Sequence, residues 1–587
     1  MKDFFKNVLA TIVGLFIFGI ITVFFCFIGA IGMITANSST KKIESNSVLL
    51  LKLDGNMSEQ DETTLSDQLY GNMGVSFKTY IEAINEAAHN NNISCIYLES
   101  GNLTADIAQR QELRDALLEF KKSGKKVIAY GENYSLLNYY LATAADKVYM
   151  NPIGSITWKG IGGEMVYVKD LLAKVGVRVV PFRMGKYKSA VEMFTEDKMS
   201  DPNREQTERY IHGWWDTVLN AVSGSRKISK DSLNAYADRL IGMEETSKMV
   251  GYKMVDGLFY NDQIKDVVKK AIGIDKDEEL NLITPSELVA QKSESAEKHI
   301  AVYYAYGNIV NNKMPQSMFG ENHEIVAKDV CRDLQDLADD DDIKAVVIRI
   351  NSGGGDAYAS EQLWHQVAEL RKKKPVVISM SGAAASGGYY MSCPANWIVA
   401  DPTTITGSIG IFGLLPDQSE LMTKKLGLKF DEVKTNRNSV FGASGHFLTG
   451  EQFNIMQTAI ENGYKLFKKR VAEGRKLSME QVENIAQGHV YLGADAIKIG
   501  LVDELGGLNK AIAKAAELAK LKNYGTASYP EAKSWLDNIM AIPDNSSFLD
   551  KQLETTFGEY YTTFKLIKDM QHRDRLQAAM PYILRIQ

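Results

Sequence analysis

The stretch that decides the fold begins with ISCIYLES at residues 93–100 and continues with KKVIAYGENYSLLNYYLATAADKVYMNP at residues 125–152. The same pattern returns as IKAVVIRI at residues 343–350 and KPVVISMSGAAASGGYYMSCPANWIVADP at residues 374–402. The two stretches align without a gap, and their apolar positions agree over most of the length. A unit that occurs twice in this way indicates an internal repeat.

Two flanking segments repeat in the same order. SVLLLKLDGN at 47–56 resembles HIAVYYAYGN at 299–308, and KMVDGL at 253–258 resembles IGLVDEL at 499–505. Three matches in one order indicate duplication. Each copy alternates short apolar, β-branched runs with helical patterns, which predicts an α/β fold of two tandem repeats with mainly parallel sheets and crossover helices. In the second copy we expect strands at 345–350, 376–380 and 397–400, and helices at 359–373 and 386–392.

Composition narrows the class of protein. The chain has 587 residues, of which 45% are hydrophobic and 24% are charged, with a formal net charge of −6. This length predicts more than one folding unit, and the apolar content excludes a largely disordered chain. A net charge so close to zero, without a block of basic residues, argues against nucleic acid as a partner. The four cysteines are too far apart for a zinc or disulfide pattern, and we expect no metal and no cofactor.

Residues 8–34, VLATIVGLFIFGIITVFFCFIGAIGMI, are almost wholly apolar and carry no charge. As a helix rising 1.5 Å per residue, this run would be about 40 Å long, enough to cross a ~30 Å hydrocarbon core. It therefore predicts a retained transmembrane anchor, with the lipid bilayer as a partner. A signal peptide cleaved near Ala36 is the alternative, although its apolar region would span only about 7–15 residues. Lysines flank both ends, so charge alone does not decide the orientation.

The second copy carries a glycine turn and a serine that the first copy lacks. Its first strand runs into NSGGGD at 351–356, a turn whose backbone N–H groups could bind a developing oxyanion, with Gly354 as the candidate donor. Ser386 follows small residues and opens a predicted helix, where the N–H of Gly387 can face the same point. Each feature alone could be a tight turn or a packing residue. Together they predict a nucleophile, and Leu136 occupies the position of Ser386 in the first copy.

A serine hydroxyl needs a base to become a nucleophile. None of the eight histidines lies in a motif that places it beside Ser386. Lysine is the known alternative, and the first copy carries Lys188 where the aligned residue of the second is Asn438. Each copy would then supply one part of a shared site, with the Lys188 amine held neutral in a low-dielectric pocket. Ser189 is a candidate for orienting that amine, and the pair could form within one chain or between chains.

These motifs resemble the long, double-domain form of the signal peptide peptidase A family, membrane-bound Ser-Lys proteases. The resemblance covers residues 48–521 and is carried by YKSAVE (187–192), ASGGYY (385–390), DPTTITGSIGIFG (401–413) and GLVDELGG (500–507). Position by position it makes Ser386 the nucleophile and Lys188 the general base, with Gly354 and Gly387 forming the oxyanion hole.

The resemblance also implies a fold like that of the crotonases and the Clp protease subunit. It implies a membrane-anchored serine endopeptidase whose catalytic body faces the periplasm from the bacterial inner membrane. Its partners would be remnant signal peptides and other hydrophobic peptides, which it degrades, and further copies of itself in a homotetramer. Two residues depart from the family pattern, since Gly353 and Met193 stand where the family has proline. Both departures concern loop rigidity and leave the reacting groups in place.

Two other classes of function stay open from the sequence. A crotonase-type enzyme acting on acyl thioesters would share the fold and the glycine turn without needing the serine, and a catalytically dead membrane scaffold would need neither. The predicted organisation is an N-terminal tail (1–7), the anchor (8–34), a linker (35–46), the N-terminal repeat (47–283), a second linker (284–298), the C-terminal repeat (299–522) and a helical C-terminal extension (523–587).

Overall fold

The computed structural model describes residues 41–61, 74–291, 297–313, 323–443, 445–531 and 577–579, together with isolated positions 14, 18, 19, 21 and 22. The predicted anchor at residues 8–34 thus lies almost wholly outside the described residues. Within the described part of the chain, no helix combines the length and apolar character needed to cross a bilayer.

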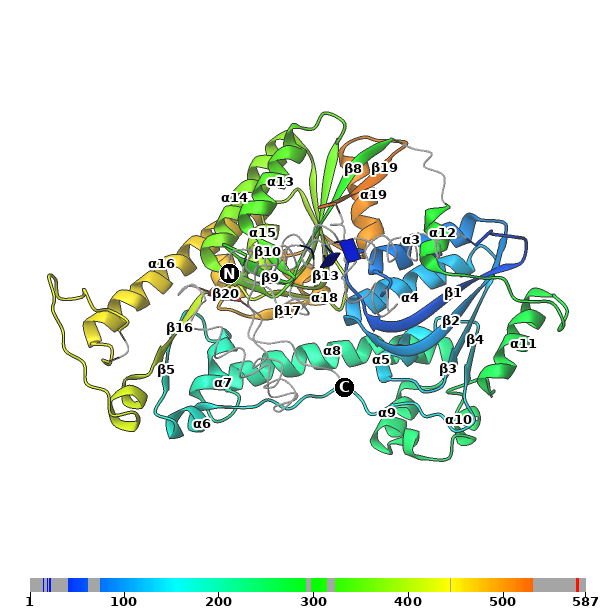
Figure 1. The fold of residues 1–587 in the computed structure, drawn as a ribbon, viewed down its shortest axis with the longest axis horizontal. Coiled ribbons are helices and arrows are strands. Elements are labelled where there is room, and N and C mark those ends of the chain that lie inside the picture. The colour runs from blue at the N-terminus through cyan, green and yellow to red at the C-terminus, as the bar shows by residue number, and fades with distance from the viewer. Residues whose placement is uncertain are drawn as a thin grey trace, which may run out of the picture.

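The first repeat is built on a parallel sheet with the strand order β6-β4-β3-β2-β1-β7. Its strands are β1 (Ser47–Asn56), β2 (Ile93–Thr104), β3 (Lys126–Gly131), β4 (Lys147–Met150), β6 (Gly257–Leu258) and β7 (Leu282–Ile283). The helices of this half are α3 (Phe77–His89), α4 (Ile107–Lys121), α5 (Leu136–Ala142), α6 (Lys169–Lys174), α7 (Glu192–Thr195), α8 (Asp201–Arg226), α9 (Lys230–Asp238), α10 (Lys248–Gly251) and α11 (Asn261–Ile272). Figure 1 shows α8 running along the molecule from one repeat to the other.

The second repeat has its own sheet, ordered β17-β15-β13-β11-β8-β19, in which β14 also pairs with β13 and β18 pairs with β14. All its described pairings are parallel except that of β15 with β17. Its strands are β8 (Lys298–Tyr306), β11 (Ala345–Ser352), β13 (Val376–Ala385), β14 (Trp397–Ala400), β15 (Ile405–Gly407), β17 (Val490–Leu492), β18 (Glu504–Leu505) and β19 (Gly525–Tyr529). Its helices are α13 (Ala327–Asp339), α14 (Ala357–Lys373), α15 (Gly387–Ser392), α16 (Gly450–Arg475), α17 (Met479–Ile485), α18 (Gly493–Ala496) and α19 (Leu508–Leu518).

The structure confirms an α/β fold with parallel sheets in both halves. An aspartate occupies the same place in each repeat: Asp106 precedes α4, and Asp356 precedes α14 and accepts a hydrogen bond from the N–H of Ala359 at 2.6 Å. Short polar side chains cap helices in this way, because the first N–H groups of a helix have no partner within it. The strand predicted at 376–380 is longer in the structure, since β13 continues through the small residues up to Ala385.

A third sheet joins the two repeats, in the order β10-β9-β12-β20-β16-β5. It consists of β9 (Asn308–Val310), β10 (Glu324–Val326), β12 (Gly354–Asp356), β20 (Gln577–Ala579), β16 (Phe412–Asp417) and, from the first repeat, β5 (Arg178–Arg183). Strands β5 and β16 pair antiparallel along their whole length, from Arg183 opposite Phe412 to Arg178 opposite Asp417. The repeats therefore exchange backbone hydrogen bonds in addition to side-chain contacts.

Two predicted boundaries change in the structure. The predicted linker at 284–298 contains a helix, α12 (Pro285–Ala290), which Thr284 caps and which packs on α3. The prediction of a helical C-terminal extension is wrong for its described parts, which include the strands β19 and β20. The reason is long-range pairing, because β19 adds to the edge of β8 and β20 lies between two strands of the second repeat.

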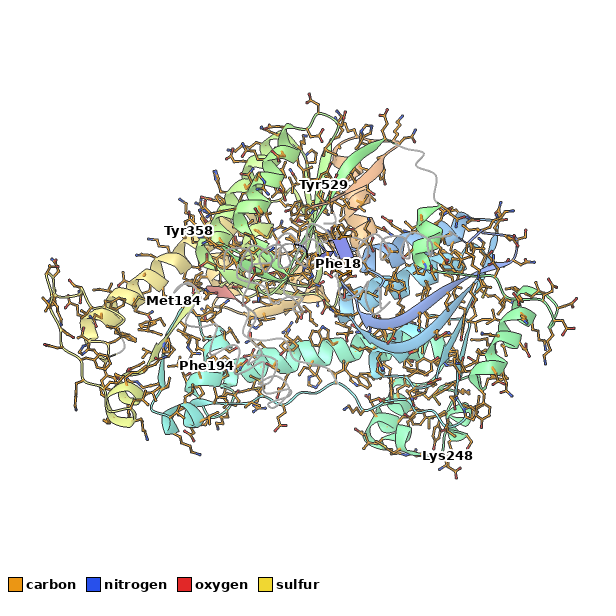
Figure 2. The ribbon with its side chains drawn as sticks, viewed as in Figure 1. Phe18, Met184, Phe194, Lys248, Tyr358 and Tyr529 are labelled. Atoms are coloured by element: carbon orange, nitrogen blue, oxygen red, sulfur yellow. The ribbon has the colours of Figure 1, made fainter. Side chains whose placement is uncertain are left out.

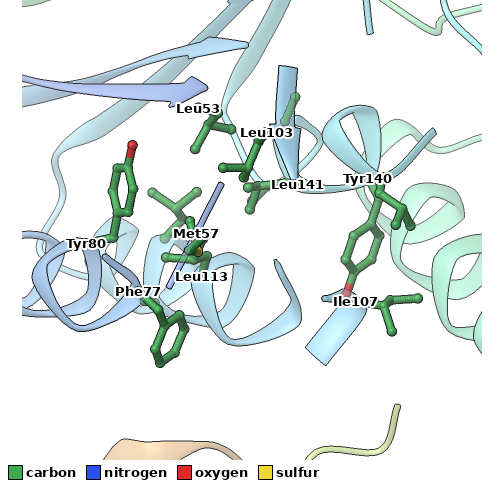
Figure 3. Packing of buried hydrophobic residues seen from close by; sticks show 14 of the residues in the cluster. Leu53, Met57, Phe77, Tyr80, Leu103, Ile107, Leu113, Tyr140 and Leu141 are labelled. Carbon is green, nitrogen blue, oxygen red and sulfur yellow. The ribbon is translucent and has the colours of Figure 1, made fainter. Parts of the chain in front are cut away.

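The apolar core also crosses between the repeats. One cluster of buried residues includes Leu49 and Leu113 from the first half together with Val347 and Ala511 from the second. Figure 3 shows its first-repeat side, where Phe77, Leu113 and their neighbours pack between the helices and the sheet. Because burial of apolar surface is the main force in folding, a core built from both halves makes the two repeats fold as one body.

A buried ionic cluster fixes the same interface. Arg349 on β11 is fully buried, and its guanidinium lies 3.0 Å from a carboxylate oxygen of Glu59 and 2.7 Å from one of Glu112, both in the first repeat. Asn351, which follows on the same strand, donates to Glu59 at 3.0 Å and to Asp106 at 2.7 Å. These contacts hold the end of β11, and so the glycine turn that follows it, against the first repeat.

Replacing Arg349 by methionine should destabilise the protein strongly, because Glu59 and Glu112 would stay buried without their countercharge. We expect a loss of about 3–5 kcal/mol in the free energy of unfolding, measured by chemical denaturation. The control is Arg332→Met, which removes an exposed pair with Asp329 and should cost no more than about 1 kcal/mol. Equal losses in the two variants would contradict a structural role for the buried cluster.

Candidate active site

Lys188 reaches the second repeat because of the strand that precedes it. The chain leaves β5, which is paired with β16, and after a short turn enters the 3-10 turn Ser189–Val191. In Figure 2, Met184 and Phe194 mark the two ends of the segment that carries the lysine. Gly488 of the second repeat packs against the Lys188 backbone so closely that a Cβ there would lie 2.7 Å from the Lys188 Cβ. The side chain of Lys188 is completely buried.

Ser386 lies at the junction of β13 and α15 in an unusual backbone conformation. Its φ is 54° and its ψ is −113°, a region that residues with a side chain rarely adopt. Two backbone hydrogen bonds hold it there: Ser386 N–H donates to the carbonyl of Gly407 at 2.8 Å, and Tyr390 N–H donates to the Ser386 carbonyl at 2.8 Å. A sharp turn of this kind directs the serine side chain away from the strand and the helix that flank it.

The amine and the hydroxyl meet in the interior. Lys188 Nζ lies 2.8 Å from Ser386 Oγ, and it lies 3.0 Å from both the carbonyl oxygen and the Oγ of Ser408. Ser386 and Ser408, like Lys188, are fully buried. The structure therefore brings together, within one chain, the two residues that the sequence placed in different repeats.

Burial lowers the pKa of Lys188 well below its ordinary value. Desolvation is the cause, because a charged amine loses its hydration in the interior while its neighbours here are hydroxyls and a carbonyl. A neutral amine at hydrogen-bond distance from a hydroxyl can accept its proton, which a lysine in water at neutral pH cannot do.

The two glycines predicted to form an oxyanion hole lie side by side. Gly354 has a φ of +100°, and a Cβ added to it would lie 2.7 Å from the amide nitrogen of Gly387. Only glycine fits there, because that Cβ would also meet the carbonyl oxygen of Ala578 at 2.1 Å. The N–H of Gly354 donates to Ser352 Oγ at 3.1 Å. The turn is thus shaped by the close approach of other backbone groups.

A second hydroxyl beside the Lys188 amine comes from Ser408, a residue that the sequence did not single out. Ser189 is the residue predicted there, but its Oγ instead accepts a hydrogen bond from Gln206 Nε2 at 3.1 Å. Ser408 lies in the motif DPTTITGSIGIFG, and its φ of 49° is a feature that the sequence does not reveal. Its N–H donates to the carbonyl of His489 at 2.7 Å, which fixes its position.

Gln206 on α8 ties the lysine segment to the second repeat. Its Nε2 donates to the carbonyl of Tyr187 and to Ser189 Oγ, both at 3.1 Å, and its Oε1 accepts from the N–H of Val490 at 3.1 Å. The two residues that flank Lys188 are thus held by a side chain that also binds β17. Gln206 therefore acts on the amine through its neighbours, as a positioning residue.

One histidine lies near the site without touching the reacting pair. The ring of His489 stacks on that of Tyr491 and meets that of Tyr187 edge to face, with a centroid distance of 4.2 Å in each case. Burial lowers the pKa of His489 to about 4, so the imidazole is neutral near pH 7. Among the residues that the structure describes, no cluster of histidine, cysteine or carboxylate side chains is arranged to hold a metal ion.

Comparison with known proteins identifies the class. The family model described as Peptidase family S49 matches residues 119–275 and 368–522, and the Clp protease model matches residues 296–397. Protease 4 of Salmonella typhi is 36% identical over 553 residues, which cover 89% of this chain and 87% of that protein. Protease 4 of Haemophilus influenzae is 35% identical, covering 87% of this chain and 86% of that protein.

A more distant relative has the same class of activity in its name. Serine protease SPPA, chloroplastic, from Arabidopsis thaliana is 29% identical over 82% of this chain and 70% of its own length. Among solved structures, ClpP1 from Listeria monocytogenes is 18% identical and covers 35% of this chain and 91% of its own, with a TM-score of 0.22, a value too low to support an argument. The chain belongs to peptidase family S49, with a Clp-protease-like α/β fold in duplicate, and is a serine protease.

The buried amine should leave a signature in the pH dependence of stability. Unfolded Lys188 binds a proton up to about pH 10.4, whereas in the folded protein its pKa is lowered, so folding releases a proton and stability rises with pH through that interval. Lys188→Met removes the effect. We expect the variant to be the more stable protein near neutrality, with an advantage that shrinks by about 1.4 kcal/mol per pH unit towards pH 10.

The measurement is the free energy of unfolding of both proteins between pH 7 and pH 10, by chemical denaturation. Lys186→Met is the matched control, because Lys186 is two residues away and exposed. A Lys188→Met difference that follows the Lys186→Met difference at every pH would show that the Lys188 amine stays protonated in the folded state.

Proposed function

We propose that this chain is a membrane-anchored serine endopeptidase with a Ser-Lys dyad that degrades remnant signal peptides after their release from preproteins. The observation that carries the proposal is the 2.8 Å distance between Lys188 Nζ and Ser386 Oγ in a fully buried site. Membership of a serine peptidase family supports the same assignment and disfavours an acyl-thioester enzyme. A catalytically dead scaffold is also disfavoured, because all the groups that the proposed chemistry needs are present.

In the proposed mechanism, neutral Lys188 takes the proton of Ser386 as its oxygen attacks the peptide carbonyl carbon. The oxyanion that forms faces the backbone N–H groups of Gly387 and Gly354. The N–H of Gly354 turns towards it from Ser352 Oγ, to which it donates in the structure. The C–N bond then breaks, and Lys188 gives the proton to the leaving amine. A water molecule, deprotonated by Lys188, then attacks the carbonyl carbon of the acyl-enzyme, and the bond to Ser386 Oγ breaks as that oxygen takes the proton back from Lys188. Ser408 orients the amine throughout.

The substrate and the setting belong to the same proposal. The apolar run at 8–34 would hold the protein in the bacterial inner membrane by a single span, with the catalytic body in the periplasm, beside the hydrophobic peptides that remain in the bilayer. The family resemblance, carried by the motifs YKSAVE and ASGGYY, supports signal peptides as the substrate. Assembly as a homotetramer rests on the same resemblance.

Substituting either member of the dyad should abolish hydrolysis of a synthetic signal peptide by the purified, detergent-solubilised full-length protein. We expect Ser386→Ala and Lys188→Met each to lower kcat by roughly 10³-fold or more, because each removes an atom that takes part in the reaction. Lys186→Met makes the same substitution in the same segment but should retain activity close to that of the unaltered protein. Near-normal rates in either dyad variant would refute the assignment, and a normal rate only on soluble, polar peptides would refute the substrate class.

A further inference from the structure

A backbone turn of the second repeat, at residues 487–489, lies against the segment of the first repeat that carries the lysine. The turn connects α17 to β17, and β17 runs beside α8 (Figure 1). Gln487 and Gly488 both have a positive φ, 56° and 75°, so the chain bends sharply here. A Cβ added at Gly488 would lie 2.7 Å from the backbone nitrogen of Lys188. The turn therefore touches the residue that supplies the proposed base.

Two further glycines allow the turn to come so close. A Cβ added at Gly185 would lie 2.3 Å from the carbonyl carbon of Gln487. One added at Gly410 would lie 3.0 Å from the Cα of Gly488 and 3.2 Å from the Cδ of Lys188. Backbone from three separate segments thus encloses the aliphatic chain of the lysine, and the contacts leave no room for side chains between them.

Hydrogen bonds join the same turn to the surroundings of the amine on two sides. The N–H of Tyr187 donates to the carbonyl of Gln487 at 3.0 Å, and the N–H of Ser408 donates to the carbonyl of His489 at 2.7 Å. Ser408 in turn contacts Lys188 Nζ through both its carbonyl oxygen and its Oγ. The residue before the lysine and the serine beside its amine are therefore held by one short piece of chain.

His489 provides the side chain that anchors this turn. Its ring stacks on that of Tyr491 and meets that of Tyr187 edge to face, the two arrangements that aromatic rings prefer. Because Tyr187 directly precedes Lys188, a shift of the histidine ring would move the lysine backbone. Burial lowers the pKa of His489 to about 4, so the ring is neutral near pH 7 and acts there through packing.

We infer that the turn at 487–489 holds Lys188 against Ser386, and that His489 is a positioning residue for this base. The inference rests on the proposed Ser-Lys mechanism and names a side chain of the second repeat on which the lysine depends. A base must lie within hydrogen-bond distance of the proton that it accepts, and a small displacement of reacting groups lowers the rate steeply. If the turn loosened, water would also reach the amine and raise its pKa towards the ordinary value.

Steady-state hydrolysis of a synthetic signal peptide by the detergent-solubilised full-length protein tests this inference. We expect His489→Ala to lower kcat about tenfold at pH 7, with KM little changed, because the substitution does not alter groups that bind the peptide. In the pH profile of kcat/KM, the acidic limb should move to higher pH by about one unit, since a less enclosed amine is protonated more readily. His489→Phe keeps an aromatic ring against both tyrosines and should restore kcat and the acidic limb.

Two more variants accompany these. Tyr236→Ala is the matched control, because Tyr236 and Tyr252 form a half-buried ring pair in the first repeat, with centroids 4.9 Å apart. It should leave kcat and the acidic limb unchanged. Gly410→Ala tests the turn without altering His489, because the added Cβ presses between Gly488 and the lysine side chain. There too we expect kcat to fall more than KM changes.

The outcomes separate the inference from the proposed function. If the unaltered protein hydrolyses the peptide, and His489→Ala and Gly410→Ala both keep its kcat and its acidic limb, the inference is wrong and the proposed function stands. If His489→Phe is as slow as His489→Ala, the imidazole itself is required and a role through packing is refuted. If Tyr236→Ala shows the same losses, weaker packing in general is the cause and the inference again fails. If the unaltered protein does not cleave the peptide, the proposed function fails, and the inference fails with it.

Discussion

A lysine amine without a countercharge, enclosed where two repeats meet, is the constraint on which the rest of the structure depends. In water the amine would be protonated and useless as a base. Burial of Lys188 lowers its pKa and so favours the neutral form, and this burial requires both repeats, because the amine comes from one and its hydroxyl partners from the other. The shared apolar core, the buried ionic cluster at Arg349 and the pairing of β5 with β16 all hold together the two repeats that enclose this one group.

Much of this arrangement is readable in the sequence. The duplication predicts the two sheets, and the places where the copies differ point to Ser386 and Lys188, because a group kept in only one copy is not needed by the fold. Two parts are not readable. Ser408 approaches the amine only because its backbone takes a positive φ. The surrounding run of Thr, Ile and Gly does not predict that conformation for a serine. Strand β20 is three residues long and depends on distant partners, so local patterns in the C-terminal extension predict helix instead.

The third sheet distinguishes this structure from two independent copies of one unit. Each repeat keeps its own parallel sheet, but the strands near the glycine turn form a sheet that draws on both repeats. Its far strand, β5, is also the strand that delivers Lys188. Backbone pairing between the repeats and the placement of Lys188 are therefore linked, and Gln206 on α8 strengthens the link through its contacts with both repeats. The position of Lys188 beside Ser386 depends on this sheet.

The backbone at Ser386 has a consequence of its own. With a φ of 54° and a ψ of −113°, Ser386 lies in a backbone region that costs a residue with a side chain about 1–3 kcal/mol. Ser408, with a φ of 49°, adds further backbone strain. Glycine would relax either position. The same change would also remove a hydroxyl that contacts the Lys188 amine. At these two residues, backbone stability and the surroundings of the amine therefore make opposite demands.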